Sequence, residues 1–208
     1  MDYIQQLINK YPQLNSLALS IESAFTIIRE SFINGGKILI AGNGGSSSDS
    51  EHIVGELMKN FVKKREIPEN FKECLFEINN EFASYLFPRL QPGLPAISLS
   101  SHTSLNTACI NDIDGNIIFA QQVYGYGKEG DVFLGISTSG NSKNILYAEI
   151  TAKAKKMKTI ALSGNDGGLL SKYADISIIV PETETYKIQE LHLPVYHCLC
   201  LMLEDYFF

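Results

Sequence analysis

The sequence predicts an α/β protein: a three-layer α/β/α sandwich built on a five-stranded parallel sheet. Short, continuous apolar runs alternate along the chain with stretches of helical periodicity. That alternation is typical of a parallel sheet covered by helices on both faces. The apolar runs have the length of buried strands, and we expect strands at 37–41, 96–99, 132–136, 159–162 and 176–180.

The segments between these runs predict the helices. Residues 14–34 predict one long amphipathic helix, because apolar side chains recur there at three- and four-residue steps. Its apolar surface exceeds what a lone exposed helix needs, which favours packing on the sheet, on a partner subunit or on both. Further helices are expected near 48–61, 104–111, 117–124, 143–156 and 185–208, with a short one after 168.

Domain organisation follows from length and rhythm. The 208 residues, 45% of them hydrophobic, are enough for one domain with a full core, and we expect a single domain over 1–208. Residues 66–91 break the α/β rhythm and predict an inserted helical segment bounded by prolines. Beside it, Lys63-Lys64-Arg65 predicts a solvated basic patch.

Charge and composition exclude several classes of function. The net charge of −6 argues against broad binding to nucleic acid or to anionic membranes. No apolar run approaches the roughly twenty residues that span a membrane, and the polar start has no secretory h-region. Cys74, Cys109, Cys198 and Cys200 form no C-x-x-C pair, so we expect free thiols in a reducing cytoplasm.

Two loops rich in serine and glycine follow predicted strands. In the first, GNGGSSS at 42–48, glycines permit a sharp turn and a close ligand, and the next helix offers unpaired N–H groups to an anion. In the second, Ser137, Thr138, Ser139 and Ser142 offer hydroxyls before another helix. Both loops lie beyond carboxyl ends of strands, where such sheets bind ligands. A phosphomonoester site is the prediction, and two serine caps without a ligand are the alternative.

His52 and Glu56 lie four residues apart and therefore on one helix face. On the last helix, Gln189 and His197 are eight residues apart and therefore also share one face. An imidazole and a carboxylate from one helix with an imidazole from another can bind zinc or act as general base and acid. A solvated His–Glu pair remains open, and His192 is interpreted as a satisfied core histidine.

With these residues in view, the chain resembles the SIS-domain sugar isomerases, and within them the phosphoheptose isomerase (sedoheptulose 7-phosphate isomerase) family. The matching motifs cover most of the chain. They are AGNGGSSSDSEHIVGEL at 41–57, NTACIND at 106–112, GDVFLGISTSGNSKNI at 130–145, MKTIALSGNDGG at 157–168 and IQELH with a later histidine at 188–197.

The resemblance implies a SIS fold, a homotetramer with sites at subunit contacts, and a small sugar phosphate as substrate. Sedoheptulose 7-phosphate would become D-glycero-D-manno-heptose 7-phosphate through a cis-enediol, with Glu56 as the base and His197 moving protons on the oxygens. It implies zinc, one ion per subunit, held by His52, Glu56, Gln189 and His197. It implies substrate contacts at Asn43, Gly44, Gly45, Glu56, Asn111, Asp112, Ser137, Thr138, Ser139, Ser142 and Gln189.

Two alternatives to this assignment remain open. One is the isomerisation of another ketose phosphate, since residues 66–91 look like an insertion relative to shorter family members. The other is a non-catalytic SIS module that senses a sugar phosphate or binds a protein. Such a sensor needs only the phosphate loops, so the presence of both Glu56 and His197 favours an enzyme.

Overall fold

The sheet at the centre of the molecule has five strands, all parallel, in the order β2-β1-β3-β4-β5. The structure is a computed structural model that describes residues 2–208. The predicted α/β fold with a five-stranded parallel sheet is confirmed. The strands are β1 (Ile38–Ala41), β2 (Ala96–Ser98), β3 (Val132–Ser137), β4 (Lys158–Ser163) and β5 (Ile176–Ile179).

The apolar runs form strands because each strand packs against helices on both of its faces. Every residue of β1 and β3 is buried, and Ile38 of β1 pairs with Ala96 on one side and Val132 on the other. The chain first adds β2 at one edge of β1 and then returns to add β3 at the other. The strand order therefore reverses between β1 and β3, where open α/β sheets form a ligand crevice.

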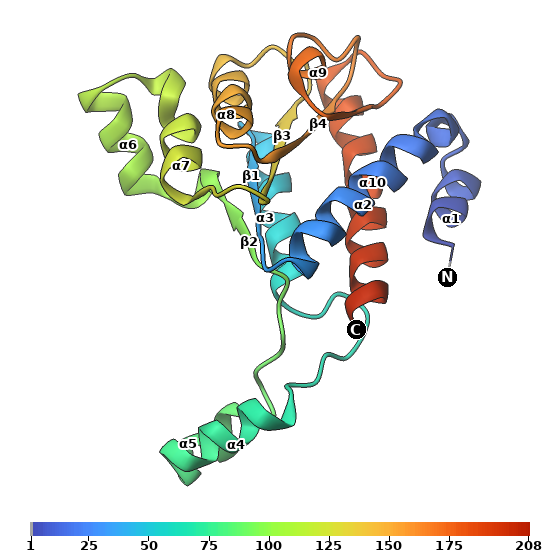
Figure 1. The fold of residues 1–208 in the computed structure, drawn as a ribbon. Coiled ribbons are helices and arrows are strands. Elements are labelled where there is room, and N and C mark those ends of the chain that lie inside the picture. The colour runs from blue at the N-terminus through green and yellow to red at the C-terminus, as the bar shows by residue number, and fades with distance from the viewer. Residues whose placement is uncertain (1) are drawn as a thin grey trace.

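Helices cover the sheet in two layers with separate cores, as Figure 1 shows. One layer holds α2, α3 and α10, with α1 against α10, and the other holds α7 and α8 beside α6. The helices are α1 (Tyr3–Lys10), α2 (Ala18–Ile33), α3 (Gly45–Met58), α4 (Glu69–Ile78), α5 (Asn80–Leu86), α6 (Thr103–Asp112), α7 (Ile118–Tyr126), α8 (Lys143–Ala154), α9 (Leu170–Tyr173) and α10 (Thr185–Phe207), with short 3₁₀ helices at Pro12–Leu17, Leu99–Ser101 and Gly115–Ile117.

Two helix boundaries differ from the prediction. The expected helix over 14–34 begins as a 3₁₀ helix, which places Leu14 and Leu17, three residues apart, in the core, and only Ala18–Ile33 is α-helical. The helix expected from residue 48 begins at Gly45 and ends at Met58. The first turn of α3 therefore lies inside the glycine loop.

The segment predicted as an insertion folds into α4 and α5, which extend away from the sheet in Figure 1. At its base, the prediction of a solvated basic patch is wrong for Arg65, which is only 3% exposed. Its guanidinium pairs with Glu204 of α10 at 3.0 Å. It also donates to the carbonyls of Leu57 and Glu56 at 2.7 and 3.0 Å, so this one side chain joins α3, α10 and the start of the segment.

Within residues 2–208, no helix combines the length and the apolar character needed to cross a bilayer.

Candidate active site

The glycine loop after β1 allows α10 to approach its backbone closely. Gly44 has a φ of +55°, a backbone conformation that residues with a Cβ rarely adopt. A Cβ on residue 45 would lie 2.5 Å from Nε2 of Gln189, so any larger residue would displace the Gln189 side-chain amide from the loop. The loop thus brings the N-terminus of α3 against the first turns of α10.

The loop after β3 lies beside the glycine loop. The side-chain amides of Asn43 and Asn144 exchange two hydrogen bonds of 2.9 Å between the two loops. The Ser137 hydroxyl, which is buried, donates to the Ser142 hydroxyl at 3.1 Å. These contacts fix the two loops relative to each other without any charged side chain.

Between the loops lies a cleft of about 350 Å³ at the point where the strand order reverses. Its lining comes from both loops and from α10, and consists of Asn43, Gly44, Gly45, Ser46, Ile136, Ser137, Thr138, Ser142, Thr185 and Gln189. Three helices, α3, α8 and α10, begin at this cleft. Helix N-termini carry unpaired N–H groups and a positive dipole, so the cleft favours an anion.

The cleft brings together seven of the residues that the sequence nominates for the substrate: Asn43, Gly44, Gly45, Ser137, Thr138, Ser142 and Gln189. Ser139 lies outside it, bordering a neighbouring hollow with Asn165 and Thr183. Asn111 and Asp112 lie at the end of α6, where their side chains bond to each other at 2.8 Å. The cleft of a single chain does not include these three.

Farther along α3, the polar side chains of His52 and Glu56 meet His197 of α10. Nε2 of His52 lies 3.1 Å from Oε1 of Glu56 and 3.5 Å from Nε2 of His197. The two imidazole rings stand edge to face at 5.0 Å. Burial lowers the pKa of His197 from its ordinary value, and the neighbouring His52 lowers it further, while Glu56 only partly offsets this.

Within residues 2–208, no group of three or more His, Cys, Asp or Glu side chains is arranged so that it could hold a metal ion, and this includes the His52, Glu56 and His197 cluster. The donor chemistry nevertheless fits, because ligand atoms bound to tetrahedral zinc at 2.0–2.1 Å are about 3.4 Å apart, close to the 3.5 Å between His52 and His197. Gln189, the fourth predicted ligand, contacts the glycine loop.

Sequence reasoning missed two residues behind the cluster. The Tyr196 hydroxyl lies 3.0 Å from Nδ1 of His52 and bonds to Oδ1 of Asp49 at 3.3 Å. Asp49 lies three residues before His52 on the same face of α3, a spacing that could have nominated it. Tyr196 carries no comparable signal, since it adjoins His197 in an apolar stretch.

His192 differs in part from its interpretation as a satisfied core histidine. It is fully buried, as expected for the core. Neither ring nitrogen makes a hydrogen bond of regular geometry within residues 2–208, although the backbone of Ser163 interacts with the ring, so the histidine is satisfied only in part. Burial lowers its pKa to about 4, which the backbone of Ser163 offsets only in part.

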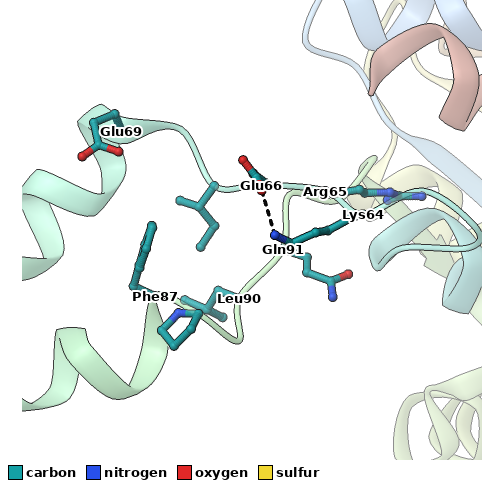
Figure 2. A pocket seen from close by; sticks show the side chains of 9 residues that line it. Lys64, Arg65, Glu66, Glu69, Phe87, Leu90 and Gln91 are labelled. Atoms are coloured by element: carbon teal, nitrogen blue, oxygen red, sulfur yellow. Dashed lines mark hydrogen bonds and ion pairs between the residues drawn. The ribbon is translucent and has the colours of Figure 1, made fainter.

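A second hollow lies at the base of the α4–α5 segment, shown in Figure 2. Its lining includes Phe87, Leu90 and Gln91, and the Lys64–Glu66 ion pair of 2.8 Å crosses its edge. Lys64 and Glu66 are 82% and 76% exposed, so this pair is solvated as predicted for the patch. The hollow shares no residue with the cleft between the serine loops.

Comparison with known proteins shows what this chain is similar to. A family model described as the SIS domain matches residues 76–164. A phosphoheptose isomerase of Helicobacter pylori (strain P12) is 40% identical over 194 residues, covering 93% of this chain and 88% of that protein. A phosphoheptose isomerase of Sulfurimonas denitrificans is 36% identical over 204 residues, covering 98% and 86%.

Solved structures show the same similarity over nearly the whole chain. The phosphoheptose isomerase of Neisseria gonorrhoeae matches with a TM-score of 0.76 at 30% identity, covering 97% of this chain and 94% of that one. The phosphoheptose isomerase from Francisella tularensis gives 0.75 at 32% identity, covering 98% and 95%. These matches include the glycine loop and α3, which the SIS-domain match leaves out.

Proposed function

The chain belongs to the phosphoheptose isomerases, a family of aldose–ketose isomerases, and we propose that it converts sedoheptulose 7-phosphate into D-glycero-D-manno-heptose 7-phosphate. The observation that carries the proposal is that α3 and α10 contribute both to the cleft and to the cluster of polar side chains beyond it. Both helices begin at the serine-lined cleft, and farther along both carry the acid–base cluster of His52, Glu56 and His197. This arrangement suits a long substrate with a phosphate at one end.

The cleft holds the phosphate in this proposal. The hydroxyl-bearing residues Ser137, Thr138 and Ser142 line this space together with the first turn of α3, whose helix dipole favours an anion. Ten residues separate Ser46 from Glu56, about 15 Å along a helix axis. Helical side chains point back toward the N-terminus, which brings Glu56 nearer to the far end of an anchored sugar chain.

Glu56 is the proposed base and His197 the proposed proton carrier. Glu56 takes a proton from C1 of the ketose, the carbon next to the carbonyl, and later returns it to C2. His197 moves a proton between the oxygens on C1 and C2 while the cis-enediol exists. Its lowered pKa leaves the ring neutral at pH 7, so it can accept a proton and release it again.

His52, Glu56, Gln189 and His197 are the residues that would hold zinc, one ion per subunit. When bound, zinc would supply Lewis-acid polarisation of the substrate oxygens. The proton transfers themselves are carried out by Glu56 and His197 in this proposal.

The test replaces the base without changing its shape. Glu56→Gln should lower kcat by about 10²–10⁴-fold and leave the KM for the sugar phosphate nearly unchanged. Wild-type protein in D₂O should exchange hydrogen at C1 of the ketose, followed by NMR, and Glu56→Gln should not. Glu51→Gln on the same helix, with an exposed side chain, is the matched control.

Two outcomes would contradict the assignment. Near wild-type kcat and exchange in Glu56→Gln would remove Glu56 as the base. If the wild-type protein exchanges hydrogen in no member of a panel of ketose phosphates, the chain is better described as a non-catalytic SIS module. Exchange only with a ketose phosphate of another length would change the assigned substrate and leave the assigned mechanism unchanged.

A homotetramer is also proposed. Helix α2 exposes Leu19 and Ile33, and α6 exposes Ile110, so both carry apolar surface that a second copy could cover. Asn111 and Asp112 lie outside the cleft of their own chain, so a role in substrate binding would place them at the site of a neighbouring copy. Light scattering should give a tetramer, and a monomer at micromolar concentration would contradict this.

A further inference from the structure

A partly buried chain of hydrogen bonds lies behind His52 and reaches two residues outside the proposed site. Tyr196 is 2% exposed, and its hydroxyl lies between Nδ1 of His52, at 3.0 Å, and Oδ1 of Asp49, at 3.3 Å. Its ring stands edge to face with that of His52, the centroids 5.5 Å apart. The hydroxyl and the imidazole are therefore held by packing as well as by the hydrogen bond.

A tyrosine hydroxyl has one proton, so it can donate to only one of these two neighbours. Oδ2 of Asp49 is buried and has no hydrogen-bond partner among residues 2–208. A buried carboxylate with so few donors is costly to leave unsatisfied, so the hydroxyl proton goes to Asp49. The hydroxyl oxygen then accepts, and the proton that it accepts is on Nδ1 of His52.

We propose that Asp49 and Tyr196 are positioning residues that keep the neutral His52 ring protonated on Nδ1, with the lone pair of Nε2 aimed between Glu56 and His197. Nε2 is the ring atom that lies 3.1 Å from Glu56 and 3.5 Å from His197. In this tautomer it can receive a proton or bind a metal ion, and either one would bridge its lone pair to Oε1 of Glu56, which is itself an acceptor 3.1 Å away. In the other tautomer it would carry a hydrogen and donate to Glu56.

The role of His52 in the site rests on the proposed function, but its tautomer does not. A histidine that binds a metal through one ring nitrogen donates its other N–H to a partner that fixes the ring, and losing that partner typically weakens metal binding by about 10–100-fold. Here the partner is a tyrosine, and a carboxylate fixes that tyrosine in turn. Neither residue needs to touch the substrate.

The test uses full-length protein stripped of metal by a chelator and labelled with ¹⁵N-histidine, at a pH where the ring is neutral. Two-bond ¹H–¹⁵N spectra show which ring nitrogen carries the proton, and a His52→Gln variant assigns the signals among the four histidines. We expect Nδ1–H for His52 in the wild type. Tyr196→Phe, which removes only the hydroxyl, should shift the ring toward Nε2–H. Asp49→Asn should do the same, because an asparagine amide can donate to the tyrosine.

Zinc titration of the same proteins is the second readout, with an expected loss of affinity of about 10–100-fold for Tyr196→Phe. Tyr206→Phe is the matched control, since Tyr206 is 52% exposed on the same helix. Nε2–H in the wild type, or a spectrum that Tyr196→Phe leaves unchanged, overturns the proposal. Neither readout uses isomerase activity, so the proposal can fail while the proposed function stands, and the reverse.

Discussion

Two buried glutamates, one on each side of the sheet, have opposite surroundings. Glu204 on α10 accepts hydrogen bonds from the N–H groups of Phe61, Val62 and Lys63 and pairs with Arg65. Glu149 on α8 is equally buried, but neither of its oxygens makes a hydrogen bond of regular geometry within residues 2–208, although the Thr159 hydroxyl lies close to the carboxyl. One carboxylate is surrounded by donors, and the other faces the core.

The two pKa values move apart as a result. Burial alone would raise the pKa of Glu204, but the backbone donors and then Arg65 lower it below its ordinary value. Burial raises the pKa of Glu149 to about 7, and the nearby Thr159 hydroxyl and Lys153 only partly offset the rise. Burial therefore does not by itself decide whether a carboxyl is charged, because the donors around it can reverse the effect.

The Glu204 network also reaches the proposed site. Arg65 pairs with Glu204 and donates to the backbone carbonyl of Glu56, the proposed base. Through this contact the end of α3 is fixed to α10. Within residues 2–208 the Glu149 side chain makes no such connection to the cluster, so changes there should affect stability and leave the site unchanged.

The largest expected effect comes from breaking the satisfied pair. Glu204→Gln leaves Arg65 buried without its counter-charge, and we expect the free energy of unfolding to fall by about 3–5 kcal/mol. Urea denaturation measures this. Glu66→Gln is the control, since it breaks the exposed pair with Lys64 near the same segment and should leave the urea midpoint unchanged. Equal shifts in the two variants would mean that the Glu204 network is no stronger than a surface pair.

How far the sequence predicts this molecule depends on the distance between interacting residues. Buried parallel strands are continuous apolar runs, so all five were found from local pattern, and the serine loops follow because strand ends meet at one edge. Arg65 was expected in solvent because its partner Glu204 is 139 residues away. Tyr196 was missed for the same reason, since Asp49 and His52 contact it only in the folded chain.

The next largest effect concerns His192, which resembles Glu149 in being buried without a hydrogen bond of regular geometry within residues 2–208. Its pKa is lowered to about 4 in the folded state, so the unfolded chain binds a proton first as the pH falls. Stability is fully present above pH 6.5 and decreases by about 1.4 kcal/mol per pH unit below it. Between pH 6.5 and 4.5 this amounts to about 2 kcal/mol, because the slope is smaller close to each of the two pKa values.

His192→Leu should remove that acid-side slope, measured as urea midpoints across the pH series. The comparison is with the slope of the wild type, so a uniform loss of stability from imperfect packing does not confuse it. An unchanged slope in His192→Leu would assign the acid sensitivity to other groups.

The smallest effect lies on the alkaline side, where Glu149 acts in the opposite direction. Its folded pKa of about 7 lies above the ordinary value of 4.5, so the unfolded chain loses its proton first as the pH rises. Stability is fully present below pH 4.5 and is lost as the pH rises through about 7. Between pH 6 and 8.5 the remaining loss is about 1.4 kcal/mol, one pKa unit.

Glu149→Gln cannot ionise, so its urea midpoint should stay level over this range while that of the wild type falls. The two midpoints should differ most at pH 8.5, with the variant the more stable. Kinetics of Glu149→Gln should match the wild type, because the side chain lies across the sheet from His52 and Glu56. A parallel decline of both midpoints would show that Glu149 is charged in the folded protein and has donors that offset its burial, as Glu204 does.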